Sequence, residues 1–116
     1  MAVQKSSGLS GPFSLTNQGV DAAVVYTSAG AYALGHTDAN NVFNIYYVGR
    51  ADGDVNKRLK DHVSSSHSQF KFAYFSSAVE AYRKECSLYH DFNPPENIVH
   101  PAAPTNSRLT CVICGT

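Results

Sequence analysis

Residues 30–49 read GAYALGHTDANNVFNIYYVG, and this segment carries the clearest structural signal in the chain. Residues 30–35 form a short run typical of a β-strand, and residues 42–49 are rich in the branched and aromatic side chains that strands favour. Between them, residues 37–41 (Thr-Asp-Ala-Asn-Asn) have turn chemistry. Two strands joined by such a turn predict a β-hairpin.

Further elements are expected on the C-terminal side of the hairpin. The polar residues 49–54 break the strand, and Asp52 or Asp54 can cap a helix that runs to about residue 64. Residues 70–75 alternate in the manner of a third strand. A second helix is expected from Ser76 or Ser77 to near Asn93, where two prolines follow. The sequence therefore predicts an α/β fold, a small antiparallel three-stranded sheet flanked by helices.

Length and composition indicate one small domain. The chain has 116 residues, of which 43% are hydrophobic. Residues 1–19 are rich in Ser and Gly and are expected to form an N-terminal arm or lead-in, with a single domain and its CxxC tail over residues 20–116. No apolar run approaches membrane-spanning length, and the N-terminus lacks the apolar stretch of a secretory signal. A cytoplasmic protein without a membrane partner is the expectation.

The net charge of zero argues against a high-affinity, non-specific nucleic-acid binder, because such proteins carry a basic excess. The charge is unevenly distributed, since basic residues gather between Arg50 and Lys84. This pattern allows a local basic face, on which Lys57 and Lys60 are the candidate substrate contacts.

Three polar side chains in the two predicted helices, Arg58, His62 and Glu85, suit chemistry on a phosphodiester. Arg58 and His62 are four residues apart and lie one above the other beside an apolar stripe. Arginine binds phosphate through paired N–H donors, and histidine can relay a proton. Glu85 falls within the apolar stripe that includes Tyr82 and Tyr89. A carboxylate buried there needs a partner, which a metal ion or Arg58 would supply.

The order and spacing of these residues resemble the GIY-YIG nuclease domain, over about residues 29–97. The two tyrosine tripeptides, Gly30-Ala31-Tyr32 and Tyr47-Val48-Gly49, are followed by Arg58, Glu85 and Asn97. Ala31 stands where the family usually has Ile, and the loop between the tripeptides is longer than usual.

The resemblance implies a metal-dependent endonuclease that hydrolyses DNA phosphodiester bonds, with Mg²⁺ or Mn²⁺ on Glu85. Arg58 would stabilise the charge on the phosphate, Tyr32 or His62 would take a proton from the attacking water, and Tyr47 would complete the pocket. Asn97 would bind substrate or hold a loop. The domain is too short for a separate target-recognition domain, so specificity would be low or come from a protein partner.

The cysteines suggest a second metal. Cys111 and Cys114 form half of a zinc site, and Cys86 and His90, four apart on a helix, are candidates for the other half. The alternative is three reduced, unpaired thiols, since an odd count cannot form a complete set of disulfides.

Two other functions fit the same residues. The chain could be a non-catalytic GIY-YIG-like module that binds nucleic acid or protein, a reading that the neutral charge favours. It could also be a small zinc-bearing interaction domain in which the tripeptides are coincidental. If these residues have no functional role, Arg58 is solvated, Tyr32 and Tyr47 are core aromatics, and Asn97 is a turn residue. Tyr26 and Tyr46 are expected to be packing or surface residues in every case.

Overall fold

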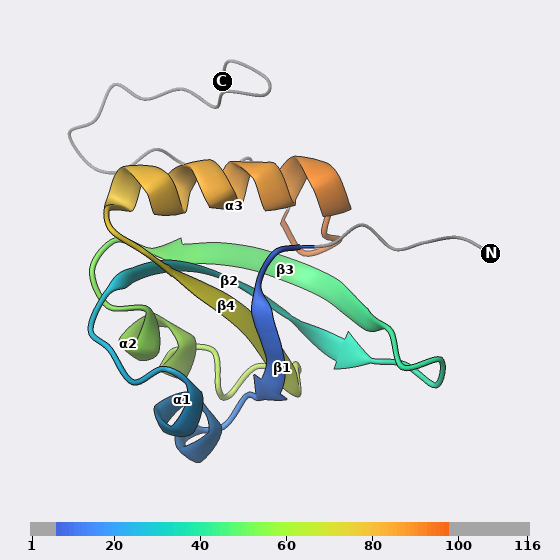
Figure 1. Cartoon of the computed structure of the whole chain (residues 1–116). Helices are drawn as coiled ribbons and strands as arrows, with labels where there is room; N and C mark the ends of the chain where they lie inside the picture. The colour runs from blue at the N-terminus through green and yellow to red at the C-terminus, as the bar shows by residue number, and fades with distance from the viewer. Residues whose placement is uncertain (1–6, 98–116) are drawn as a thin grey trace.

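The computed structural model describes residues 7–97. Its strands are β1 (Ser10–Ser14), β2 (Ala29–Thr37), β3 (Phe43–Ala51) and β4 (Gln69–Phe75), and its helices are α1 (Asn17–Ala23), α2 (Val55–Lys60) and α3 (Ala78–Phe92). No helix within residues 7–97 is long and apolar enough to cross a membrane. The strands form one antiparallel sheet in the order β1-β4-β2-β3. Helix α3 covers one face of this sheet, and α1 and α2 lie on the other (Figure 1).

The predicted α/β class and the β2–β3 hairpin are confirmed, but the sheet has four strands rather than three. The additional strand, β1, comes from the expected N-terminal arm or lead-in and pairs with β4, Phe13 lying opposite Phe70. Four of the five β1 residues are exposed, so this edge strand lacks the apolar alternation that would reveal it in the sequence. Helix α2 also ends at Lys60, earlier than expected, and turns follow it.

Side-chain alternation along the strands builds a core on each face of the sheet. On the α1–α2 face, the buried cluster includes Tyr32, Leu34, Val55 and Leu59. On the α3 face, it consists of Ala31, Ala33, Phe43, Val48 and Leu88. Because β2 is a central strand covered on both faces, residues 29–35 are all buried. Tyr32 therefore faces α2, the helix that carries Arg58.

Two glycines of the tyrosine tripeptides are required by close packing. A Cβ at Gly30 would lie 2.7 Å from the carbonyl oxygen of Ala73, and a Cβ at Gly49 would lie 2.5 Å from Tyr32 Oη. Gly49 is opposite Tyr32 in the β2–β3 register, so the aromatic ring lies across the bare backbone. The two tripeptides thus fit each other, the glycine of the second leaving room for the tyrosine of the first.

Candidate functional site

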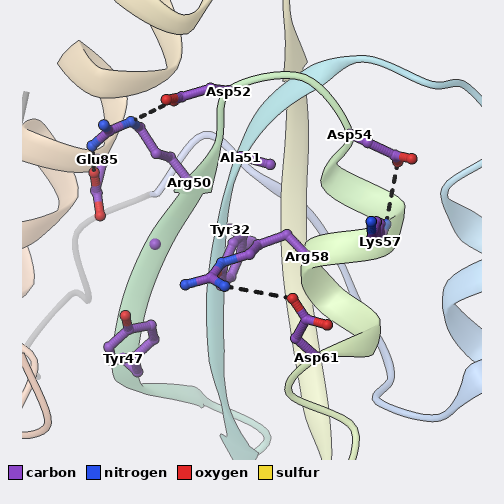
Figure 2. Close-up of a pocket in the computed structure, with 11 residues that line it drawn as sticks. Tyr32, Tyr47, Arg50, Ala51, Asp52, Asp54, Lys57, Arg58, Asp61 and Glu85 are labelled. Carbon is purple, nitrogen blue, oxygen red and sulfur yellow. Dashed lines mark hydrogen bonds and ion pairs between the residues drawn. The ribbon is translucent and has the colours of Figure 1, made fainter. Parts of the chain in front are cut away.

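A cavity of about 480 Å³ opens where the end of β3 meets α2 and α3 (Figure 2). Side chains from both faces of the sheet reach it because β3 is an edge strand. The lining residues are Tyr32, Tyr47, Gly49, Arg50, Ala51, Asp52, Asp54, Lys57, Arg58, Asp61 and Glu85. The cavity thus brings together the tyrosines of both tripeptides, Arg58, Lys57 and Glu85, which are far apart in the sequence.

Tyr32, which lines this cavity, is hydrogen-bonded to His62. Tyr32 Oη lies 2.8 Å from His62 Nε2, and the Tyr32 side chain is otherwise fully enclosed. Burial raises the pKa of Tyr32 above its ordinary range, with Tyr47 adding to the effect, so Tyr32 remains a neutral phenol at physiological pH. Burial, followed by the nearby Arg58 charge, lowers the pKa of His62. His62 is therefore a neutral imidazole that can accept a proton.

Arg58 projects from α2 toward the cavity, in front of Tyr32 (Figure 2). The guanidinium contacts the Tyr32 hydroxyl, and its ion pair with Asp61 is long: Nη1 lies 3.5 Å from Asp61 Oδ2, and both side chains are about half exposed. Exposed ion pairs of this kind contribute about 0–1 kcal/mol. The guanidinium can therefore leave Asp61 for an anion at little cost.

Glu85 is buried as the sequence predicted, and it forms an ion pair with Arg50 rather than with Arg58. Arg50 Nη1 donates to Glu85 Oε1 at 2.8 Å, and the two side chains are 13% and 10% exposed. The expectation that Arg58 would partner Glu85 is corrected on this point. Arg58 projects from α2 on one face of the sheet, whereas Glu85 belongs to α3 on the other, where the end of β3 places Arg50.

Two of the expected substrate contacts lie elsewhere. Lys60 Nζ lies 2.6 Å from Asp21 on α1 and does not line the cavity. The Asn97 side chain bonds the backbone of the edge strand, accepting from Val48 N at 2.8 Å and donating to Val48 O at 2.9 Å. This pairing fastens the segment after α3 to β3, which agrees with the expectation that Asn97 holds a loop.

Tyr26 and Tyr46, which were expected to have no role in the site, occupy surface positions. Tyr26 is 67% exposed and packs edge-on against Tyr74. Tyr46 is 36% exposed and stacks on His67. Neither lines the cavity, as expected for packing or surface residues.

The predicted zinc site falls partly outside the described residues, because Cys111 and Cys114 lie beyond residue 97. Of the other two candidate ligands, Cys86 is buried in α3 and His90 lies one turn further along the helix. Within residues 7–97, no group of three or more His, Cys, Asp or Glu side chains is arranged to hold a metal ion. The zinc site stays a prediction.

Sequence reasoning missed several residues of the cavity: Arg50, Asp52, Asp54 and Asp61. Arg50, Asp52 and Asp54 follow the Tyr47-Val48-Gly49 tripeptide directly, and Asp61 lies between Arg58 and His62. Charged residues that adjoin a candidate site in this way were the available signal. The sequence could not show that they line the cavity, because this depends on where β3 ends and α2 begins.

Comparison of the chain with models of known protein families, with curated proteins and with solved structures finds no match.

Proposed function

We propose that this chain is a GIY-YIG-type endonuclease that hydrolyses DNA phosphodiester bonds with Mg²⁺ or Mn²⁺. One observation carries the proposal: residues selected from sequence alone lie around one cavity, although they come from β2, β3, α2, the turn after α2, and α3. Tyr32, Tyr47, Arg58 and Glu85 line it, and His62 is hydrogen-bonded to Tyr32. A packed core does not require an arginine, a histidine and a carboxylate at such positions.

Arg58 is the residue best suited to bind the scissile phosphate. Its guanidinium lines the cavity, stays charged, and contacts Tyr32 and, at a longer distance, Asp61. Two parallel N–H donors match two phosphate oxygens, and the interaction strengthens as negative charge develops in the transition state. Lys57, one residue earlier on α2 and also at the cavity, adds a second positive charge for the DNA backbone.

The Tyr32–His62 pair provides a route for the proton of the attacking water. Tyr32 can accept that proton while its own phenolic proton passes to His62 Nε2, 2.8 Å away. In the alternative, His62 accepts the proton from the water itself. Both routes require neutral His62, the state that the lowered pKa favours.

Glu85 suits a divalent cation, because Mg²⁺ is commonly held by one or two carboxylates together with substrate phosphate and water. Its side chain lines the cavity that would take the phosphate. When bound, the cation would stabilise negative charge on the phosphate oxygens. Glu85 would hold the divalent cation. In the protein without ligands, the Arg50 guanidinium binds the same carboxylate and would compete with the cation.

A second candidate is a non-catalytic module that binds nucleic acid or protein. One observation favours it: the three basic residues at the cavity, Arg50, Lys57 and Arg58, are outnumbered by four acidic residues, Asp52, Asp54, Asp61 and Glu85. Such a cavity attracts a polyanion only weakly. A binding module should retain DNA or protein but leave every phosphodiester bond intact.

The test is incubation of the purified protein with linear, nicked, flapped and branched DNA, with Mg²⁺, Mn²⁺ or EDTA. Cleavage of at least one substrate is expected with a divalent ion and not with EDTA. Glu85→Gln should bind DNA and lose the metal-dependent cleavage, whereas Glu80→Gln, an exposed position on the same helix, should cleave normally. Cleavage that persists in EDTA would refute the metal role, and binding without cleavage by the wild type would favour the binding module.

A further inference from the structure

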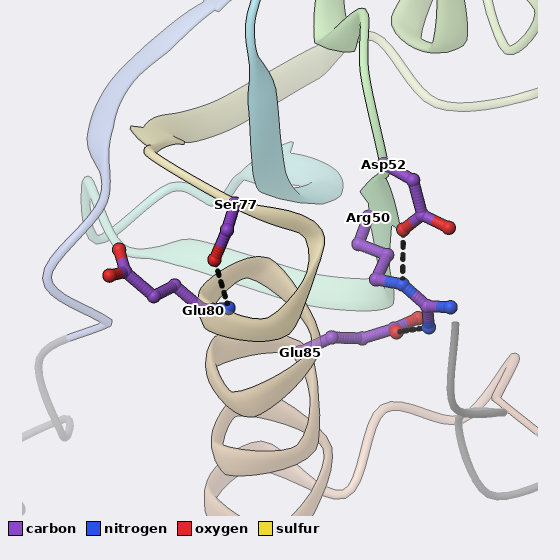
Figure 3. A network of polar contacts seen from close by, with 5 residues as sticks. All are labelled: Arg50, Asp52, Ser77, Glu80 and Glu85. Carbon is purple, nitrogen blue, oxygen red and sulfur yellow. Dashed lines mark hydrogen bonds and ion pairs between the residues drawn. The ribbon is translucent and has the colours of Figure 1, made fainter. Parts of the chain in front are cut away.

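Arg50 occupies a position between two carboxylates that the proposed hydrolysis leaves unexplained (Figure 3). Its Nε donates to Asp52 Oδ1 at 2.7 Å, and its Nη1 donates to Glu85 Oε1 at 2.8 Å. The guanidinium carbon also lies 5.2 Å from the centroid of the Tyr82 ring. These contacts hold a cation of the chain itself on the carboxylate that the proposed metal needs.

We propose that Arg50 is a positioning residue that changes partners when substrate and metal bind. In the protein alone it neutralises and orients Glu85; with both ligands present, the divalent ion takes its place on Glu85, and the guanidinium turns to a DNA phosphate. This inference rests on the proposed function. Both Arg50 and Glu85 line the same cavity, so an ion on Glu85 and a phosphate on Arg50 would share one site.

The electrostatics explain why the pair forms and why it can be exchanged. Burial disfavours the charged guanidinium, but the bonds to Asp52 and Glu85 outweigh this effect and raise the pKa of Arg50. Removing one partner of such a pair leaves an uncompensated buried charge, which is unfavourable. Metal on Glu85 frees the guanidinium, and phosphate on Arg50 frees the carboxylate. The unfavourable free energy of breaking the Arg50–Glu85 ion pair is therefore incurred only once when both ligands bind.

Metal and DNA should consequently bind with positive coupling. Each ligand removes an interaction that opposes the other, and such coupling is reciprocal by thermodynamic linkage. The chain should bind a free divalent ion weakly and bind it more tightly when DNA occupies the cavity. Arg50 thereby protects Glu85 from cations when no substrate is present.

The first experiment titrates Mn²⁺ alone into the metal-free protein and measures bound ion by electron paramagnetic resonance. Arg50→Met should bind Mn²⁺ about fivefold more tightly or better than the wild type, the lower range of typical coupling. Arg83→Met removes the same charge from an exposed position on α3 and should leave the affinity nearly unchanged. Equal affinities in Arg50→Met and Arg83→Met would overturn the proposal.

A second experiment measures DNA affinity in EDTA, where no metal-dependent cleavage occurs, and its main comparison leaves Arg50 unchanged. Glu85→Gln weakens the hold on Arg50, so it should tighten DNA binding more than Glu80→Gln, which removes an equal charge at the exposed start of α3. The double variant Arg50→Met/Glu85→Gln should lose this excess. Equal effects of the two glutamines would contradict the exchange. A failure of the nuclease proposal is distinguishable, because the wild type would then cleave nothing while both titrations still report on Arg50.

Discussion

Replacement of Gly49 by Ala tests the packing of Gly49 against Tyr32 at the cavity. An added Cβ would lie 2.5 Å from Tyr32 Oη and 2.6 Å from Cζ, whereas carbon atoms in favourable contact are about 3.5–4.0 Å apart. Tyr32 is fully enclosed, and its hydroxyl is bonded to His62, so the ring cannot move aside freely. Overpacking of this kind costs about 1–3 kcal/mol. Gly49→Ala should lower the free energy of unfolding by that amount.

Gly53, which lies in the turn just after β3, provides a matched control. A Cβ at Gly53 would meet nothing within 4 Å, so Gly53→Ala should leave stability unchanged or raise it by about 0.4–1 kcal/mol through a less flexible unfolded chain. The assay is urea unfolding followed by circular dichroism, with equal m-values required for the comparison. If Gly49→Ala were as stable as Gly53→Ala, the ring of Tyr32 would not lie on Gly49, and the described packing at the cavity would be refuted.

Two further predictions concern titration and zinc. Since the pKa of His62 is lowered from 6.5, protonation favours the unfolded chain, and the stability contributed by neutral His62 is fully present above that pH and is lost as the pH falls below it. Urea unfolding over this pH range should show the wild type losing stability relative to His62→Gln, and parallel profiles would contradict the lowered pKa. If Cys86, His90, Cys111 and Cys114 bind zinc, elemental analysis should find about one equivalent, and chelation should lower the melting temperature. Protein purified without chelators that contains no metal, with its thiols freely titratable, would exclude the site.

The sequence was most informative where a local pattern and the tertiary fold demand the same residue. The hairpin, the later strand and the long helix followed from alternation, turn residues and the serine before α3; Ser77 does cap that helix, accepting from the backbone N–H of Glu80. Strand β1 was not predicted because its residues are mostly exposed. Its place in the sheet depends on pairing with β4, which no local pattern records.

The candidate site likewise has features that the sequence predicted and features that it could not predict. The buried Glu85 was visible as a charge within an apolar stripe. Arg58 and His62 were expected on one helix face because they are four apart, but α2 ends at Lys60, and His62 reaches Tyr32 from the turn that follows. The partner of Glu85 could not be predicted, because it depends on how β3 ends beside α3. The Arg50–Glu85 contact joins residues 35 positions apart, and only the assembled sheet brings them to 2.8 Å.

The most direct test of the proposed nuclease is the rate of Mn²⁺-dependent DNA cleavage by Arg58→Lys compared with the wild type, on the substrate that the wild type cleaves best. Arg58 is half exposed, so the substitution should leave the fold intact, as circular dichroism would verify. Lysine keeps the charge but cannot make paired contacts to a phosphate, and losing one such stabilising donor typically slows a reaction about 100-fold or more. The account predicts a loss of that size. Cleavage by Arg58→Lys at the wild-type rate would contradict it.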